Sequence, residues 1–357
     1  MNLKKMLSLL MALVMVVGLG AISLADDYPI PNKLSDKPVI AVMTHSLTAE
    51  STQRDIQQLR NECDQRGWTL RVEAAGGEMG PQLSTMESLI NVGVDAIILI
   101  YVHVDALGDA IAEARAKGIG VYCLDTEAVP GVIVNATMPN GVAGATLAYY
   151  GINRLGRVGN VVVLNCKWHI ARRRALAAEA IISDFPNMDI LATEYISQAS
   201  YTQDSYDYMQ NWLTRFGDDI DWVFGDWDAL GMGAARAIME RGYTVDDMFV
   251  TGCDGGSEAF QEILDPENPF VASYVQPFEA FAHELCEVID QIQNEGIAPG
   301  APGSMVPASK VIYVPGTIVD ETSCPPVGSN INSLFDYYDP NAGPEAWYNA
   351  GTPYTTK

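Results

Sequence analysis

The chain has 357 residues, of which 48% are hydrophobic and 18% are charged, and its 21 Lys+Arg against 45 Asp+Glu give a formal net charge of −24. This composition is globular, and the length corresponds to about two domains. The acidic balance argues against nucleic acid, because phosphate binding needs clustered Lys and Arg. It argues equally against attachment to an anionic membrane through a polybasic patch, so neither partner is expected.

The N-terminus has the layout of a secretory signal peptide. Lys4 and Lys5 precede an apolar run over residues 6–19, and Ser23-Leu24-Ala25 places small residues at a cleavage position before an acidic pair. The alternative is an uncleaved anchor, since the run approaches the about 20 residues that a membrane span needs. The polar, proline-containing sequence that follows favours cleavage. We therefore predict a signal peptide over residues 1–25, cleaved near Ala25, and an exported soluble protein.

The six cysteines do not form a disulfide pattern. Cys123, Cys166 and Cys253 end or follow apolar strand-like runs, and Cys63 and Cys286 lie in helical patterns. Such positions are typical of buried free thiols. No C-x-x-C pair is present for metal binding or redox chemistry.

From residue 38 onward, short apolar runs alternate with amphipathic helical segments. The predicted strands cover residues 39–43, 70–73, 96–100, 121–124, 160–164, 190–195, 222–225, 248–253 and 311–314. The predicted helices cover residues 49–66, 83–91, 106–117, 142–155, 171–184, 203–216 and 229–241. The run Ala96–Ile100 is apolar throughout, which is typical of a strand buried on both faces. The alternation predicts two successive α/β lobes with parallel sheets.

Ligands of open parallel sheets bind beyond the carboxyl ends of the strands. Polar or aromatic side chains follow most of the predicted strands: His45, Asp125, Thr126, Trp168, the cluster Arg172–Arg174, Tyr201, Asp226, Trp227, Asp228 and Asp254. Carboxylate and guanidinium groups make charge-assisted hydrogen bonds to hydroxyls, and aromatic faces cover the C–H faces of a sugar ring. The set therefore suits a polyhydroxylated ligand.

Each of these residues also has a structural interpretation. Asp254 before two glycines is typical of a turn, Asp228 of a helix cap, and Trp168 and Trp227 of packing within a lobe. Enzyme motifs are missing: the sequence has no G-x-x-x-x-G-K-[ST], G-x-S-x-G or H-E-x-x-H. Its four histidines have no ligand spacing. No catalytic residue, metal or cofactor is expected.

Taken in order, several segments resemble the type I periplasmic sugar-binding proteins of ABC transporters, the ribose- and galactose-binding group. The segments are Val39-Ile-Ala-Val-Met43, Gly118-Ile-Gly-Val with Asp125, Ala171-Arg-Arg-Arg174, Trp222-Val-Phe-Gly-Asp-Trp-Asp228, Val250-Thr-Gly-Cys-Asp254-Gly255 and Val275-Gln-Pro277. The resemblance covers roughly residues 36–320.

The resemblance implies two doubly wound parallel-sheet lobes joined by a multi-strand hinge. Crossings near residues 138, 276 and 306 would give an N-terminal lobe of 36–138 plus 277–306, a C-terminal lobe of 139–276 plus 307–323, and a tail of 324–357. It also implies a periplasmic monomer that closes over a sugar or polyol and is recognised by a membrane permease or a chemoreceptor.

The strand-end residues and the resemblance together give the expected ligand-binding set: His45, Asp125, Thr126, Trp168, Arg174, Tyr201, Trp227, Asp254 and Gln276. His45, Trp168, Tyr201 and Trp227 would pack on the sugar ring. Asp125, Arg174 and Asp254 would bind hydroxyls, and Gln276 would serve both site and hinge. Ribose does not follow, because Thr126 stands where ribose binders carry arginine and Trp227 where many carry asparagine.

Three alternatives to sugar transport are considered from the sequence. One is the sensing of a sugar-like signal, such as autoinducer-2 or a cyclitol. Another is a carbohydrate-acting enzyme that uses Asp226 and Asp228. A regulator of the lactose-repressor type would need a basic helix-turn-helix before residue 38, where the signal peptide lies.

Overall fold

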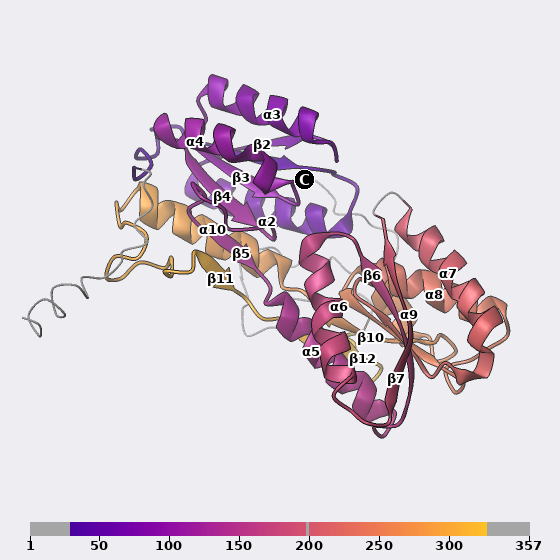
Figure 1. Cartoon of the computed structure of the whole chain (residues 1–357). Helices are drawn as coiled ribbons and strands as arrows, with labels where there is room; N and C mark the ends of the chain where they lie inside the picture. The colour runs from indigo at the N-terminus through magenta and orange to yellow at the C-terminus, as the bar shows by residue number, and fades with distance from the viewer. Residues whose placement is uncertain (1–28, 198–199, 327–357) are drawn as a thin grey trace, which may run out of the picture.

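The computed structural model describes residues 29–197 and 200–326, which form two lobes, each built on one sheet (Figure 1). The predicted signal peptide, and residues 327–357 of the predicted tail, lie outside the described residues. Within the described ranges, no helix combines the length and the apolar character needed to cross a bilayer.

The first lobe is a six-stranded sheet in the order β11-β5-β4-β3-β1-β2. Its strands are Val39–Thr44 (β1), Thr69–Ala74 (β2), Ala96–Ile100 (β3), Gly120–Leu124 (β4), Asn135–Thr137 (β5) and Val311–Tyr313 (β11). Helices pack on both faces: Glu50–Arg66 (α2) and Phe278–Gln293 (α10) on one, and Met79–Val92 (α3), Val104–Leu107 (η1) and Gly108–Ala116 (α4) on the other. The alternation of β1 sets this division, because Ile40 and Val42 pack toward α2 while Ala41 and Met43 pack toward α3.

The second lobe repeats this plan with the strand order β12-β10-β9-β8-β6-β7. Its strands are Gly159–Cys166 (β6), Met188–Ile196 (β7), Trp222–Gly225 (β8), Phe249–Asp254 (β9), Phe270–Val275 (β10) and Thr317–Asp320 (β12). Asn140–Arg154 (α5) and His169–Ile182 (α6) cover one face; Tyr201–Phe216 (α7), Asp228–Glu240 (α8) and Ser257–Leu264 (α9) cover the other, with the short turn Gly217–Asp219 (η2) after α7.

All the neighbouring strands are parallel except β12, which runs antiparallel to β10. In each sheet the first strand lies one place in from an edge, the second strand forms that edge, and the later strands are added on the other side of the first. Both lobes are therefore doubly wound. The predicted fold class is confirmed.

The chain crosses between the lobes three times. It leaves the first sheet after Thr137 and returns to the first lobe after Val275, where α10 packs on α2. The third crossing differs from the expected position near residue 306. Val311–Tyr313 pairs with β5 of the first sheet, and the chain reaches the second sheet only at Thr317. Both are short edge strands, so their sequences do not reveal which sheet they join.

Local sequence explains the most accurate boundaries. All five residues of Ala96–Ile100 are fully buried, as their continuous apolar character predicts. Helix α2 is capped at its C-terminus by Gly67, whose φ of 69° is a conformation that glycine adopts without a side-chain penalty. No disulfide joins any of the six cysteines, all of which lie in the described residues: five are buried and Cys324 is half-buried. Burial raises the pKa of Cys63 to about 12, so this thiol is unreactive at neutral pH.

Candidate ligand-binding site

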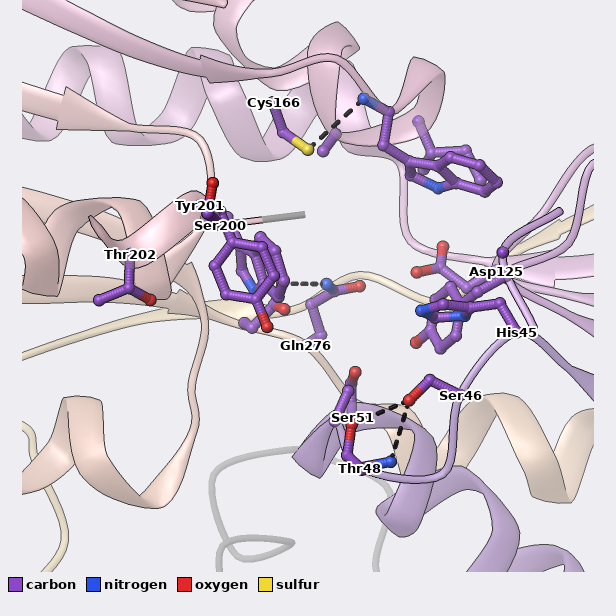
Figure 2. Close-up of a pocket in the computed structure, with 18 of the residues that line it drawn as sticks. His45, Ser46, Thr48, Ser51, Asp125, Cys166, Ser200, Tyr201, Thr202 and Gln276 are labelled. Carbon is purple, nitrogen blue, oxygen red and sulfur yellow. Dashed lines mark hydrogen bonds between the residues drawn. The ribbon is translucent and has the colours of Figure 1, made fainter. Parts of the chain in front are cut away.

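A cavity of about 630 Å³ opens between the lobes, at the carboxyl ends of the strands. Most of the residues expected to bind ligand line it: His45, Asp125, Trp168, Arg174, Tyr201, Trp227, Asp254 and Gln276. Figure 2 shows Gln276 between Tyr201 on one side and Asp125 and His45 on the other. The cavity is therefore built by both lobes and by the second crossing segment.

Arg174 organises the floor of the cavity. Its side chain is only 4% exposed, and its Nε donates to Asn140 Oδ1 at 2.7 Å. Its Nη1 donates to the backbone oxygen of Asp226 at 2.9 Å and to Asp254 Oδ1 at 3.1 Å. Gln276 Nε2 donates to the same oxygen of Asp254. These bonds hold the polar side chains in place before a ligand binds. Binding therefore costs little side-chain entropy.

The two neighbouring arginines serve elsewhere. Arg172 lies over the ring of Tyr195 with its guanidinium carbon 5.6 Å from the ring centre. Arg173 is exposed and pairs across the lobes with Glu127. Of the Arg172–Arg174 cluster, Arg174 is thus the member that lines the cavity.

Three residues around the cavity have left-handed backbone conformations. Tyr101 follows β3 with φ 50°, Asp125 follows β4 with φ 43°, and Asp254 ends β9 with φ 135°. Such conformations cost about 1–3 kcal/mol each in residues other than glycine and concentrate at functional sites. Here they turn side chains out of the sheet and into the space between the lobes.

The charges in the cavity disfavour an anionic ligand. Within the described residues, Arg174 is the one Lys or Arg side chain that lines this cavity, beside the acids Glu78, Asp125 and Asp254. Burial raises the pKa of Asp125 to about 6, against the lowering effect of Arg174 and of a hydrogen bond from Thr137. At neutral pH the carboxylates therefore outnumber the single cation, which is already paired.

Two polar atoms in the lining are ready to bond to a ligand. His45 Nδ1 and Gln276 Oε1 are buried and have no hydrogen-bond partner among the described residues. Burial and the nearby His103 lower the pKa of His45, which keeps its imidazole neutral at pH 7. A buried polar atom without a partner is costly, so both sites gain from a hydroxyl group.

Aromatic rings line the second lobe's side of the cavity. Tyr201 and Trp227 pack against each other with ring centres 4.3 Å apart. Trp168 reaches across the gap to His103 of the first lobe, at 5.2 Å between ring centres. Flat apolar faces beside hydrogen-bonding groups match the two kinds of surface on a sugar or polyol.

Thr126 is the one residue of the expected ligand-binding set that does not line the cavity. Its Oγ1 donates to the backbone oxygen of Leu124 and accepts from the backbone N–H of Tyr101, both at 3.1 Å. It therefore supports Tyr101, which does line the cavity and which the sequence reading missed. The same strand-end rule would have found Tyr101, because it directly follows the buried strand Ala96–Ile100.

Asp226 and Asp228 both bond to backbone rather than forming an exposed acid pair. Asp226 is fully buried and accepts from the backbone N–H of Cys166 at 2.8 Å. Asp228 starts α8 and accepts from the N–H groups of Gly255 and Gly256 at 2.7 and 3.2 Å. Neither carboxylate lines the 630 Å³ cavity.

The model of the periplasmic binding protein domain matches residues 40–297. The chain belongs to the periplasmic binding protein family. This confirms the family inferred from the loop-end residues and their order.

The relatives that this chain matches include a xylitol-binding protein and a ribose import binding protein. A xylitol-binding protein from Mycolicibacterium smegmatis is 32% identical over 51% of this chain and 52% of its own length, so the match spans about half of that protein. A ribose import binding protein from Bacillus subtilis is 28% identical over 66% of this chain and 74% of its own.

Solved structures show the same fold. A periplasmic solute-binding protein from Actinobacillus succinogenes with bound D-allose has a TM-score of 0.72 at 22% identity, covering 81% of this chain and 99% of that one. An ABC transporter solute-binding protein from Bacillus halodurans with bound myo-inositol has a TM-score of 0.69 at 19% identity, covering 80% and 95%.

Proposed function

We propose that this family member is an exported receptor that closes its lobes over a neutral monosaccharide or polyol and delivers it to an ABC transporter permease. The paired Arg174 and Asp254 carry this proposal, together with Gln276 on the second crossing and the unpartnered Nδ1 of His45. Relatives that bind xylitol and ribose support the class of ligand.

In this mechanism each lobe supplies part of the site. Asp125 and His45 bond to ligand hydroxyls from the first lobe, and Arg174 and Asp254 from the second. A ligand that contacts both sets stabilises the closed arrangement over the open one, because only closure brings all its contacts together. Gln276 lies where the chain crosses between lobes, so the ligand also contacts the hinge.

The test is a binding screen of purified protein against pentoses, hexoses, pentitols, cyclitols and autoinducer-2, read by thermal shift and titration calorimetry. A ligand present at 100 times its Kd stabilises the folded state by about 2.7 kcal/mol. Arg174→Ala should abolish the shift, whereas Arg172→Ala should leave it unchanged, since Arg172 lies over Tyr195. No shift with any neutral sugar or polyol would contradict the proposal.

The carbohydrate-acting enzyme is the weaker alternative. Its candidate acids Asp226 and Asp228 accept bonds from backbone N–H groups and stand outside the cavity lining. We therefore expect the ligand to be recovered unchanged after incubation with the protein. A product that differs from the ligand, seen by mass spectrometry, would favour the enzyme.

A further inference from the structure

A polar contact joins the lobes beside the cavity. Helix α2 of the first lobe starts at Glu50, and its carboxylate accepts from the backbone N–H of Ser257 at 3.0 and 3.1 Å. It also accepts from Ser257 Oγ at 2.8 Å. Ser257 is the first residue of α9 in the second lobe, so the acid lies at the positive end of that helix.

This contact lies outside the proposed ligand site. Glu50 and Ser257 line an adjoining cavity of about 710 Å³, which shares Asp254, Tyr201 and Trp227 with the ligand cavity, but neither Glu50 nor Ser257 lines the ligand cavity itself. Glu50 is half-buried, and burial raises the pKa of its carboxyl. A charge-assisted contact of this kind is stronger than an exposed ion pair.

The segment that carries Ser257 is held rigidly to Asp254. Asp228 accepts from the N–H groups of Gly255 and Gly256 and from Ser273 Oγ at 2.6 Å. Gly255 has a φ of 76°, and a Cβ there would lie 2.5 Å from Val275 Cγ1, so this position requires glycine. Motion of Asp254 toward the first lobe therefore carries Ser257 with it.

Arg54, one turn after Glu50 on α2, contacts the same segment. It is 1% exposed, and its Nε and Nη2 donate to the two carboxylate oxygens of Glu279 on α10, both at 2.9 Å. Its Nη1 and Nη2 also donate to the backbone oxygens of Gly255 and Gln276, respectively, both at 3.4 Å. The first turns of α2 thus face both the β9–α9 segment and the crossing.

We propose that Glu50 and Ser257 form a closure latch, a contact made when the lobes close that slows ligand release without touching the ligand. This inference rests on the proposed function. Asp254 contacts the ligand and Ser257 contacts Glu50 from one rigid segment, so the same movement completes both contacts. Glu50 and Ser257 are positioning residues that set how long the closed form lasts.

The experiment measures sugar binding and dissociation by stopped-flow tryptophan fluorescence, using the best ligand of the screen. The variants are Glu50→Ala, Glu50→Gln, Ser257→Ala and the double variant Glu50→Ala/Ser257→Ala. Glu258→Ala is the matched control, because it removes an exposed acid next to Ser257 on α9 but leaves the Glu50 carboxylate that accepts from Ser257. Ligand-free melting temperature and small-angle scattering check that each variant folds.

We expect Glu50→Ala to raise the dissociation rate about 10-fold, as for the loss of a charged hydrogen bond. Glu50→Gln should have a smaller effect, since its amide oxygen still accepts from Ser257. The double variant should lose little more than Glu50→Ala alone, because both remove one contact. Association rates and the ranking of sugars should not change.

The two proposals fail in distinguishable ways. If the wild type binds sugar and Glu50→Ala dissociates at the wild-type rate, the latch is wrong and the proposed function stands. If Glu258→Ala accelerates release as much as Glu50→Ala, the release rate depends on the net charge of this region and not on the Glu50–Ser257 contact. The latch would then also be wrong. If the wild type binds no sugar or polyol in the screen, the proposed function itself fails.

Discussion

Arg174 Nη1 lies 3.1 Å from Asp254 Oδ1, and both residues belong to the second lobe. The pair does not depend on the first lobe, since the remaining bonds of Arg174 run to Asn140 and to the backbone of Asp226. In the proposed mechanism this half of the site is assembled before closure, and a ligand bound there completes the site by contacting the first lobe.

Gly144 on α5 controls the position of Arg174. A Cβ at Gly144 would lie 1.9 Å from the backbone oxygen of Arg174, so α5 and α6 approach closely at this point. We expect Gly144→Ala to cost about 1–3 kcal/mol of stability through overpacking, and to weaken ligand binding without touching the ligand. Chemical denaturation and calorimetry measure the two effects.

Gly141 on the same helix provides the control. A Cβ there meets nothing within 4 Å, and alanine favours helix over glycine by about 1 kcal/mol. Gly141→Ala should therefore keep or raise stability and keep ligand affinity. Equal losses for both variants would show that the close contact with α6 is not the cause.

Asp226 makes stability depend on pH. Burial raises its pKa to about 7 in the folded protein, against about 4 in an unfolded chain. The folded state keeps this proton over a range where the unfolded state releases it, so the contribution of Asp226 to stability falls as pH rises from about 4 to 7. The loss is at most about 4 kcal/mol, at about 1.4 kcal/mol per pKa unit.

Asp226→Asn should remove this dependence. Its amide oxygen still accepts from the N–H of Cys166, and the amide carries no charge to desolvate. Ligand-free unfolding curves at pH 5 and pH 8 should differ less in the variant than in the wild type. If the free energy of unfolding of the wild type rose relative to that of Asp226→Asn as the pH increases, the prediction would be contradicted.

Tyr101 donates a hydrogen bond to the buried carboxyl group of Asp55, next to the site. Its hydroxyl donates to Asp55 Oδ2 at 3.1 Å, while Oδ1 of this fully buried side chain has no partner among the described residues. Burial and the charges of Asp125 and Glu279 raise the pKa of Asp55. Tyr101→Phe should lower the free energy of unfolding by about 1–3 kcal/mol, because Asp55 loses its partner.

Tyr149→Phe is the comparison for this loss, since Tyr149 is 47% exposed and water can replace its hydroxyl contacts. Urea unfolding of both variants gives the difference. Equal stability of Tyr101→Phe and the wild type would mean that the Asp55 contact contributes nothing.

Charge in the cavity should exclude anionic ligands. Glu78, Asp125 and Asp254 line it with one cation, Arg174, which is already bonded to Asp254. An aldonic acid should bind at least about 100-fold more weakly than the neutral pentitol of the same length, because like charges across a buried contact cost several kcal/mol. Competition calorimetry at two salt concentrations measures this ratio, and a tighter aldonic acid would contradict the neutral-ligand assignment.

Local patterns predicted much of the fold. The buried run Ala96–Ile100 and the glycine that ends α2 depend on nearby sequence alone. The assignment of Val311–Tyr313 to the first sheet depends on a partner strand, β5, more than 170 residues earlier in the chain, so no local pattern reveals it. The helix Phe278–Gln293 was not placed, although Cys286 lies in a helical pattern.

The site also contains residues that the local sequence predicted and residues whose roles depend on distant parts of the chain. The rule that ligands lie beyond strand ends located Asp125 and Asp254. It did not separate Asp125 from Thr126, because the direction of adjacent side chains depends on backbone angles such as the φ of 43° at Asp125. The roles of Asp226 and Asp228 depend on N–H groups tens of residues away.

The three crossings also constrain how the chain reaches its native state. The first sheet is incomplete until Val311–Tyr313 takes its place beside β5, and α2 lacks its neighbour until Phe278–Gln293 is made. Neither lobe is one continuous stretch of polypeptide. The N-terminal lobe therefore cannot complete its folding before the C-terminal residues have been synthesised. Such a delay suits the export proposed above, in which the chain crosses a membrane before it folds.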